Sequence, residues 1–159
     1  MKLNARALAF TAALTLTLAF LPAAAQEKEK DTEQKISRAQ VPPPVLAAFA
    51  KSYPQAKVVG YSREVENGKT LYEIESKEGA MTRDATYLAD GTLHLVEESM
   101  PASELPQPVT EALHKNYPKA QIKLAEKLTE GGKISYELHL KQDGKELEVK
   151  FDPDGKIVK

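Results

Sequence analysis

The 159-residue chain contains no cysteine and no tryptophan, and only 6% of its residues are aromatic. Without cysteine it can form no disulfide, no thiolate nucleophile, no iron–sulfur cluster and no cysteine-ligated zinc site. Acidic and basic residues nearly balance, 23 against 22, so no excess of positive charge attracts the phosphates of a nucleic acid. We therefore expect one modest globular unit or two very small ones, with no nucleic-acid partner.

The first 25 residues have the features of a bacterial secretory signal peptide. Lys2 and Arg6 precede an apolar run over 7–21, and small residues occupy positions 23 and 25. The run is shorter than the roughly 20 residues that cross a bilayer. We predict cleavage after Ala25, a periplasmic or secreted location, and no membrane span in the mature chain.

Residues 26–40 are predicted to form a polar, flexible lead-in. The segment reads QEKEKDTEQKISRAQ, and Ile36 is its only large apolar residue. Such a stretch buries too little apolar surface to offset the entropy lost on ordering.

After the lead-in the same unit occurs twice. Residues 41–95 align with 105–159 at a constant offset of 64 without a gap. The identities include residues that set backbone geometry: Pro42/Pro106, Pro44/Pro108, Tyr53/Tyr117, Pro54/Pro118, Gly68/Gly132, Tyr72/Tyr136, Glu73/Glu137, Asp90/Asp154 and Gly91/Gly155. We predict repeat 1 at 41–96, a linker at 97–104 and repeat 2 at 105–159.

Each copy is predicted to be α+β, with a short helix packed on one face of a four-stranded antiparallel sheet. Pro44 and Pro108 suit a first helical turn, and Tyr-Pro pairs end the helices after about ten residues. Beyond them, apolar and polar residues alternate between glycine-containing turns. The predicted strands are 57–65, 70–77, 81–88 and 92–97, then 121–128, 133–141, 145–151 and 156–159. Because each copy has a thin core, we expect the two to pack together or to extend one another's sheet.

The repeated elements resemble a known family. VPPPVLAAFAKSYPQAKV, YEIE and LADGTL, repeated as LPQPVTEALHKNYPKAQI, YELHL and FDPDGKI, are similar to the PepSY-like family of β-lactamase-inhibitor-like domains, over residues 41–159. The resemblance implies a helix against a four-stranded sheet in exported bacterial proteins. It also implies an architecture like that of β-lactamase inhibitor proteins, which present a concave sheet to an enzyme. No inhibitor contact residue transfers to this chain.

The sequence shows no catalytic constellation. His94, His114 and His139 are the only histidines, and none has a histidine at the matching position of the other copy. We predict no catalytic residue, no cofactor and no resident metal. The tract 152–155 is interpreted as a hairpin turn, because the glutamate that an EF-hand requires would fall beyond Lys159. A small-ligand or metal-binding envelope protein that uses His94, His139 and outward glutamates is the alternative function.

The open sheet face is the predicted site. Alternation points Tyr72 and Tyr136 toward the helices and Glu73 and Glu137 outward. On the open face of the first copy it places four large apolar residues, predicted to bind a partner: Val59, Tyr61, Leu71 and Val96. The leading hypothesis is a non-enzymatic binding module for a protein or peptide of the cell envelope, such as a hydrolase or protease that it restrains. Cover by the linker or the lead-in is the other explanation of this face.

Overall fold

The computed structural model describes residues 33–158. Its helical elements are η1 Arg38–Gln40, α1 Pro43–Ser52, η2 Ala102–Glu104 and α2 Gln107–Asn116. Its strands are β1 Gln34–Lys35, β2 Lys57–Glu66, β3 Lys69–Glu78, β4 Met81–Leu88, β5 Leu93–Ser99, β6 Gln121–Glu130, β7 Lys133–Gln142, β8 Lys145–Phe151 and β9 Ile157–Val158. The predicted signal peptide, 1–25, lies outside the described residues.

Both main helices begin and end where the prolines predict. Proline occupies the first turn of α1 and of α2, where its missing N–H costs nothing. At the C-caps, the N–H of Tyr53 donates to the carbonyl of Phe49, and the N–H of Tyr117 donates to the carbonyl of Leu113. The proline after each tyrosine prevents another helical turn.

The strands form one sheet, which corrects the prediction of a separate four-stranded sheet in each copy. Residues 33–158 form nine antiparallel strands, which follow one another in chain order from β1 to β9. The two halves join through β5, where Val96 lies opposite Ala85 of β4 and also opposite Thr129 of β6. Pairing on both sides leaves β5 with no free edge and lets two thin units share one sheet. Of the two arrangements expected, the copies therefore extend one another's sheet.

The structural repeat begins earlier than the sequence repeat. β1 and η1 match the end of β5 and η2 at the same offset of 64 residues, since Gln34 pairs with Arg63 as Glu98 pairs with Lys127. Ile36 packs against the core of the first copy as Met100 packs against that of the second. Residues 34–40 are thus ordered rather than flexible, and 97–99 continue β5 rather than forming a linker.

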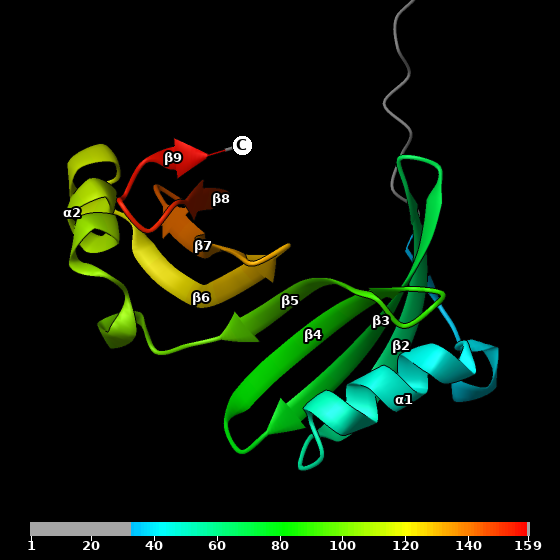
Figure 1. The fold of residues 1–159 in the computed structure, drawn as a ribbon. Coiled ribbons are helices and arrows are strands. Elements are labelled where there is room, and N and C mark those ends of the chain that lie inside the picture. Colours follow the sequence, from blue (N-terminus) through cyan, green and yellow to red (C-terminus); the bar gives the residue numbers. More distant parts are fainter. Residues whose placement is uncertain (1–32, 159) are drawn as a thin grey trace, which may run out of the picture.

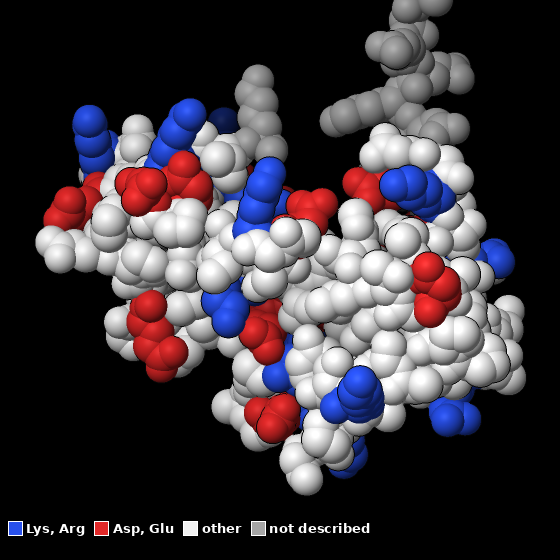
Figure 2. All heavy atoms as spheres, viewed as in Figure 1, with Lys and Arg blue, Asp and Glu red and all other residues white. Residues whose placement is uncertain are grey.

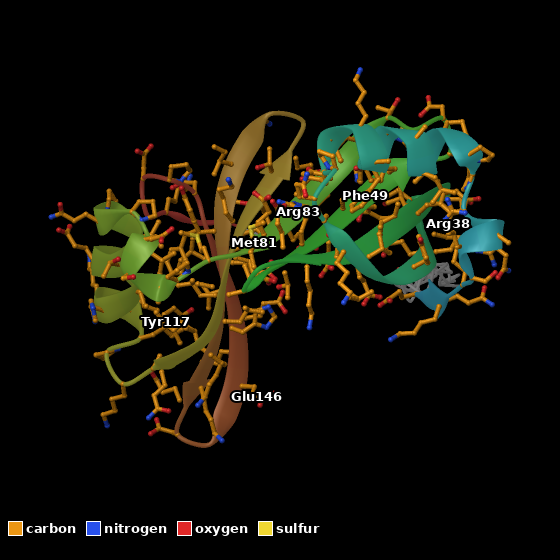
Figure 3. All side chains as sticks on the ribbon, turned by 90° about the horizontal axis from the view of Figure 1, so that it is seen from below. Arg38, Phe49, Met81, Arg83, Tyr117 and Glu146 are labelled. Carbon is orange, nitrogen blue, oxygen red and sulfur yellow. The ribbon has the colours of Figure 1, made fainter. Side chains whose placement is uncertain are left out.

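The two helices cover the same face of the sheet, one over each half (Figures 1 and 3). Val96 belongs to the core under α1 and lies opposite Thr129. Ala125 shares a face with Thr129 because side chains alternate, and it belongs to the core under α2. We call this side of the sheet the helix face and the other side the open face.

An ionic network on the helix face ties the two copies together. The buried Arg83 of β4 donates from Nε to Glu98 of β5 at 2.9 Å, and Lys127 of β6 lies 3.3 Å from the same carboxylate. The Arg83 guanidinium also lies 4.0 Å from the centre of the ring of Tyr53, the residue that follows α1. Burial raises the pKa of Glu98, but hydrogen bonds from Arg83 and Lys127 outweigh it and hold that pKa below its usual value.

The Asp-Gly turns fix each helix on its sheet. Gly91 has φ +87°, and a Cβ added to it would lie 2.7 Å from the carbonyl oxygen of Pro44 in α1. Gly155 makes the same approach to Pro108 of α2. Glycine is required at both turns because of the positive φ and because of the close contact.

Candidate binding face

The structure separates the four residues predicted for the open face. Val59 is 54% exposed, whereas Val96 is 5% exposed and Leu71 is 1% exposed. Tyr61 packs against the core under α1, which also contains Val96, so placing these two on the open face was wrong. Leu71 does lie on the open face, but its side chain is buried.

β-Bulges are the physical reason for these errors. An extra residue between Val58 and Gly60 shifts the register of β2 against β3, so Tyr61 lies opposite Ile74 on the helix face. A second irregularity between β4 and β5 precedes the pairing of Val96 with Ala85. Each extra residue reverses the faces of the residues beyond it.

None of the described helices lies on the open face, yet the sheet curls far enough to bury part of that face. Leu71, Thr86 and Leu128, from β3, β4 and β6, are almost fully buried there. His94 shows the curl directly, since its Nε2 lies 3.4 Å from Glu66 of β2 and 4.0 Å from Glu130 of β6. The bent sheet, with both ends rising on one side, is visible in Figure 1.

Three carboxylates form a row across the open face. Glu75 of β3 lies directly opposite Asp84 of β4, and Asp84 lies directly opposite Glu97 of β5. We call Glu75, Asp84 and Glu97 the acid row. All three are half-buried, and none forms an ion pair with a residue that the structure describes.

The surroundings of the acid row disfavour ionised carboxylates. Burial, followed by repulsion from Glu137, Glu126 and Asp84, raises the pKa of Glu97 to about 7. Burial, followed by repulsion from Asp84 and other acids, likewise raises the pKa of Glu73 to about 7. The pKa of Asp84 is also raised, chiefly by burial and then by Glu75. Glu73 and Glu97 are therefore only partly ionised near pH 7, and within residues 33–158 no cation forms an ion pair with the acid row.

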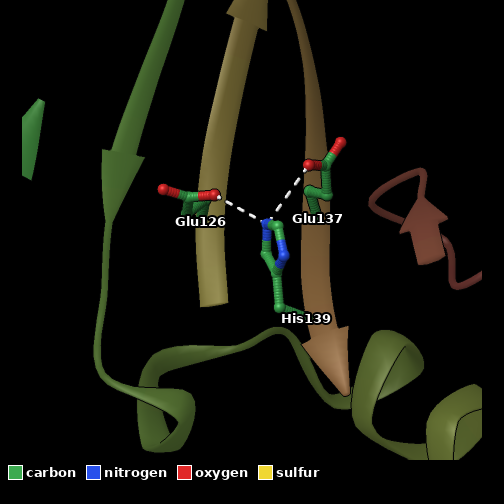
Figure 4. Close-up of side chains that lie close together, drawn as sticks. All are labelled: Glu126, Glu137 and His139. Carbon is green, nitrogen blue, oxygen red and sulfur yellow. Dashed lines mark ion pairs between the residues drawn. The ribbon is translucent and has the colours of Figure 1, made fainter. Parts of the chain in front are cut away.

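A second group of titratable residues lies on the same face in the other half of the molecule. His139 of β7 has its Nε2 3.4 Å from Glu126 of β6 and 3.5 Å from Glu137 of β7 (Figure 4). Lys150 of β8 lies 3.2 Å from Glu137. Burial raises the pKa of Glu126, although His139 opposes the shift. We call Glu126, Glu137 and His139 the Glu–His cluster.

The Glu–His cluster is the repeat counterpart of acids in the first half. At the offset of 64, Glu73 matches Glu137, and Glu75 matches His139. One ligand atom from each member of the Glu–His cluster lies within 4.8 Å of the others, and Glu33, Glu73 and Glu75 meet the same condition. Mixed histidine and carboxylate donors suit several divalent metals. Within residues 33–158, the ion-pair partners of His94 and His139 are all glutamates.

Two important members of the face were missed in the sequence. Neither Glu97, at the boundary between the predicted strand 92–97 and the predicted linker, nor Glu126 was among the predicted site residues. The bulge between Ile122 and Leu124 reverses β6, as its counterpart reverses β2. The outward direction predicted for Glu73 and Glu137 is confirmed, because each is paired in register with other open-face residues.

No described helix has the length and apolar character needed to cross a bilayer. The architecture defines a class of protein in which two repeats, each a helix packed on strands, share one antiparallel sheet and leave the other face of that sheet open. The chain belongs to the family described as "Putative beta-lactamase-inhibitor-like, PepSY-like", whose model matches residues 9–93 and again residues 78–159. This confirms the resemblance and the tandem arrangement.

Solved structures share the fold at low sequence identity. A protein of Bacteroides eggerthii, described as a "putative periplasmic" protein, is 13% identical with a TM-score of 0.65, covering 75% of this chain and 86% of its own. A DUF2874 family protein of Bacteroides ovatus is 18% identical with a TM-score of 0.61, covering 74% and 85%. A BLIP-like protein of Bacteroides fragilis is 16% identical with a TM-score of 0.58, covering 73% and 82%. No curated protein matches the sequence.

Proposed function

We propose that this chain is an exported, non-enzymatic binding module of the bacterial envelope that docks a protein or peptide on its open face. The observation that carries the proposal is the unequal use of the two sheet faces. The helix face is filled by α1 and α2, whereas within residues 33–158 the open face carries no helix and its acid row has no cationic partner. Unneutralised, partly desolvated charge in a curved sheet is suited to recognition.

The compartment and the class of partner rest on similarity. The signal-like segment at 1–25 and the periplasmic description of the Bacteroides eggerthii protein support a periplasmic or secreted location. The family description and the BLIP-like structure support a hydrolase or protease as the partner, restrained by contact with the open face. Architecture alone does not carry an activity, so the face itself has to be tested.

The absence of cysteine makes a direct blocking experiment possible. A Glu148→Cys variant introduces one thiol at an exposed open-face position, and a Glu111→Cys variant introduces one on the exposed side of α2. Each is coupled to maleimide-polyethylene glycol and used to recover partners from periplasmic extract. We expect the open-face polymer to abolish recovery of a partner that the unmodified protein and the α2-labelled variant retain. Equal recovery by both labelled variants would refute docking on this face.

A second candidate function is metal binding by the Glu–His cluster. The specific observation is the three ligand atoms within 4.8 Å of one another, from two neighbouring strands. Calorimetric titration with zinc, copper and calcium salts tests it, with a His139→Gln variant as the comparison. Saturable heat that the variant loses supports a site there, and equal heat from both proteins excludes one.

A further inference from the structure

The acid row breaks the usual rule for pairing charges across strands. Like charges directly opposite each other destabilise an antiparallel sheet, and lysine would be the ordinary partner for each of these acids. Here Glu75, Asp84 and Glu97 occupy one continuous line over three adjacent strands. Neighbouring strands are about 4.8 Å apart, so the carboxylates are held near one another by the backbone.

The imbalance belongs to this face rather than to the whole molecule. The chain has a formal net charge of only −1. On the side seen in Figure 2, acidic and basic side chains are interspersed. On the helix face, Glu98 is matched by Arg83 and Lys127. The acid row is therefore a local concentration of negative charge.

Leucines border the acid row. Leu128 of β6 lies directly opposite Glu97, and Leu95 is on the same face of β5, two residues from Glu97. Leu95 is only half-buried, so part of its side chain remains available for contact. Apolar surface beside negative charge suits a side chain with an aliphatic stem and a cationic head, as in lysine and arginine.

We propose that the segment docking on the open face is rich in lysine and arginine, with its cationic groups over the acid row and an aliphatic stem against the exposed part of Leu95. The inference rests on the proposed function and specifies the chemistry of the partner. The occupant brings the cationic partners that the described residues do not give the acid row. A divalent metal is the competing occupant, and the experiment separates the two.

The probe is a fluorescent octalysine peptide, titrated against the exported chain in low-salt buffer containing EDTA. A face variant, Asp84→Asn/Glu97→Gln, removes two acid-row charges with little change of shape. A control variant, Glu104→Gln/Glu111→Gln, removes two exposed charges from η2 and α2. We expect the face variant to weaken octalysine binding at least about tenfold and the control variant to weaken it less than about twofold.

Several results would overturn the proposal. Equal weakening by both variants would show attraction by overall charge only, and an octaglutamate peptide that binds as well as octalysine would exclude charge recognition. If calorimetry with calcium chloride gives saturable heat that the face variant loses, and octalysine does not bind to the unmodified protein, the acid row is a metal site instead. If circular dichroism shows that the face variant is unfolded, Glu75→Gln/Asp84→Asn gives the same comparison.

The blocking experiment keeps the two proposals apart. If polymer at position 148 prevents partner recovery but octalysine binding is insensitive to the acid row, the docking face stands and the basic segment is excluded. If neither effect is seen, both proposals fail. If the polymer blocks octalysine as well as the partner, the basic segment is supported on the face itself.

Discussion

Replacement of Glu97 by glutamine should stabilise the protein at alkaline pH and leave it unchanged in acid. The pKa of Glu97 is raised from 4.5 to about 7, so below pH 4.5 the carboxyl is protonated in both the folded and unfolded states. As the pH rises through 4.5 to 7, the unfolded state loses this proton first, and the folded state loses stability. Glu97→Gln removes a carboxyl group whose ionisation costs free energy in the folded protein.

The magnitude follows from the same shift. A change of this size corresponds to about 3 kcal/mol between the protonation states, and solvent screening of a half-exposed group reduces it to roughly 1–2 kcal/mol. Urea unfolding followed by circular dichroism, at pH 4 and pH 8, measures the free energy of unfolding in a chain without tryptophan. Glu104→Gln, on the exposed η2, is the control. If Glu97→Gln raises the free energy of unfolding equally at both pH values, or lowers it at pH 8, the reasoning is refuted.

Two further substitutions test the packing. Gly91→Ala should lower the free energy of unfolding by about 2–4 kcal/mol, because Gly91 combines a positive φ with a close approach to Pro44. The control Gly68→Ala, at φ +74° with nothing within 4 Å, should lower it by about 1–2 kcal/mol. Equal losses in urea unfolding would show that the contact with Pro44 has no role. Tyr87→Phe should raise stability by about 1 kcal/mol, because the buried Tyr87 hydroxyl finds no partner among the described residues and Phe151 fills the matching place in the second copy; a lower melting temperature would show that the hydroxyl is satisfied.

The parts of the fold that could be predicted are those determined by local backbone chemistry. Proline fixes its own φ and restricts the residue before it, and glycine permits a positive φ, so both helices and the Asp-Gly turns follow from the sequence. The shared strand could not be derived this way, because pairing between β5 and β6 depends on which edges meet in space. The matching roles of β1 and the end of β5 are hidden because Gln34 and Lys35 match Glu98 and Ser99, and neither pair is identical.

The candidate site was predictable only where alternation is uninterrupted. Glu73 and Glu137 lie on β3 and β7, which pair with β4 and β8 without a register shift, and their direction was correct. In β2 the isolated Gly60 is a signal of a bulge that could have been used. In β6 the matching residue is Leu124, which gives no such signal, so the direction of Glu126 needed the register of the sheet.

The duplication preserved the fold while the open face diverged. The helix-ending tyrosines and the glycines under the helices are the same in both copies, but paired open-face positions differ: Ser62/Glu126, Glu75/His139, Asp84/Glu148 and Thr86/Lys150. Positions that pack each helix on the sheet are held by the shared geometry, whereas open-face positions have no contact with α1 or α2 and have diverged. Since β5 joins both halves into one curved surface, the two patterns are presented side by side as a single asymmetric face. Such a face cannot offer two equivalent sites to two identical ligands, and it is better suited to one occupant that contacts both halves.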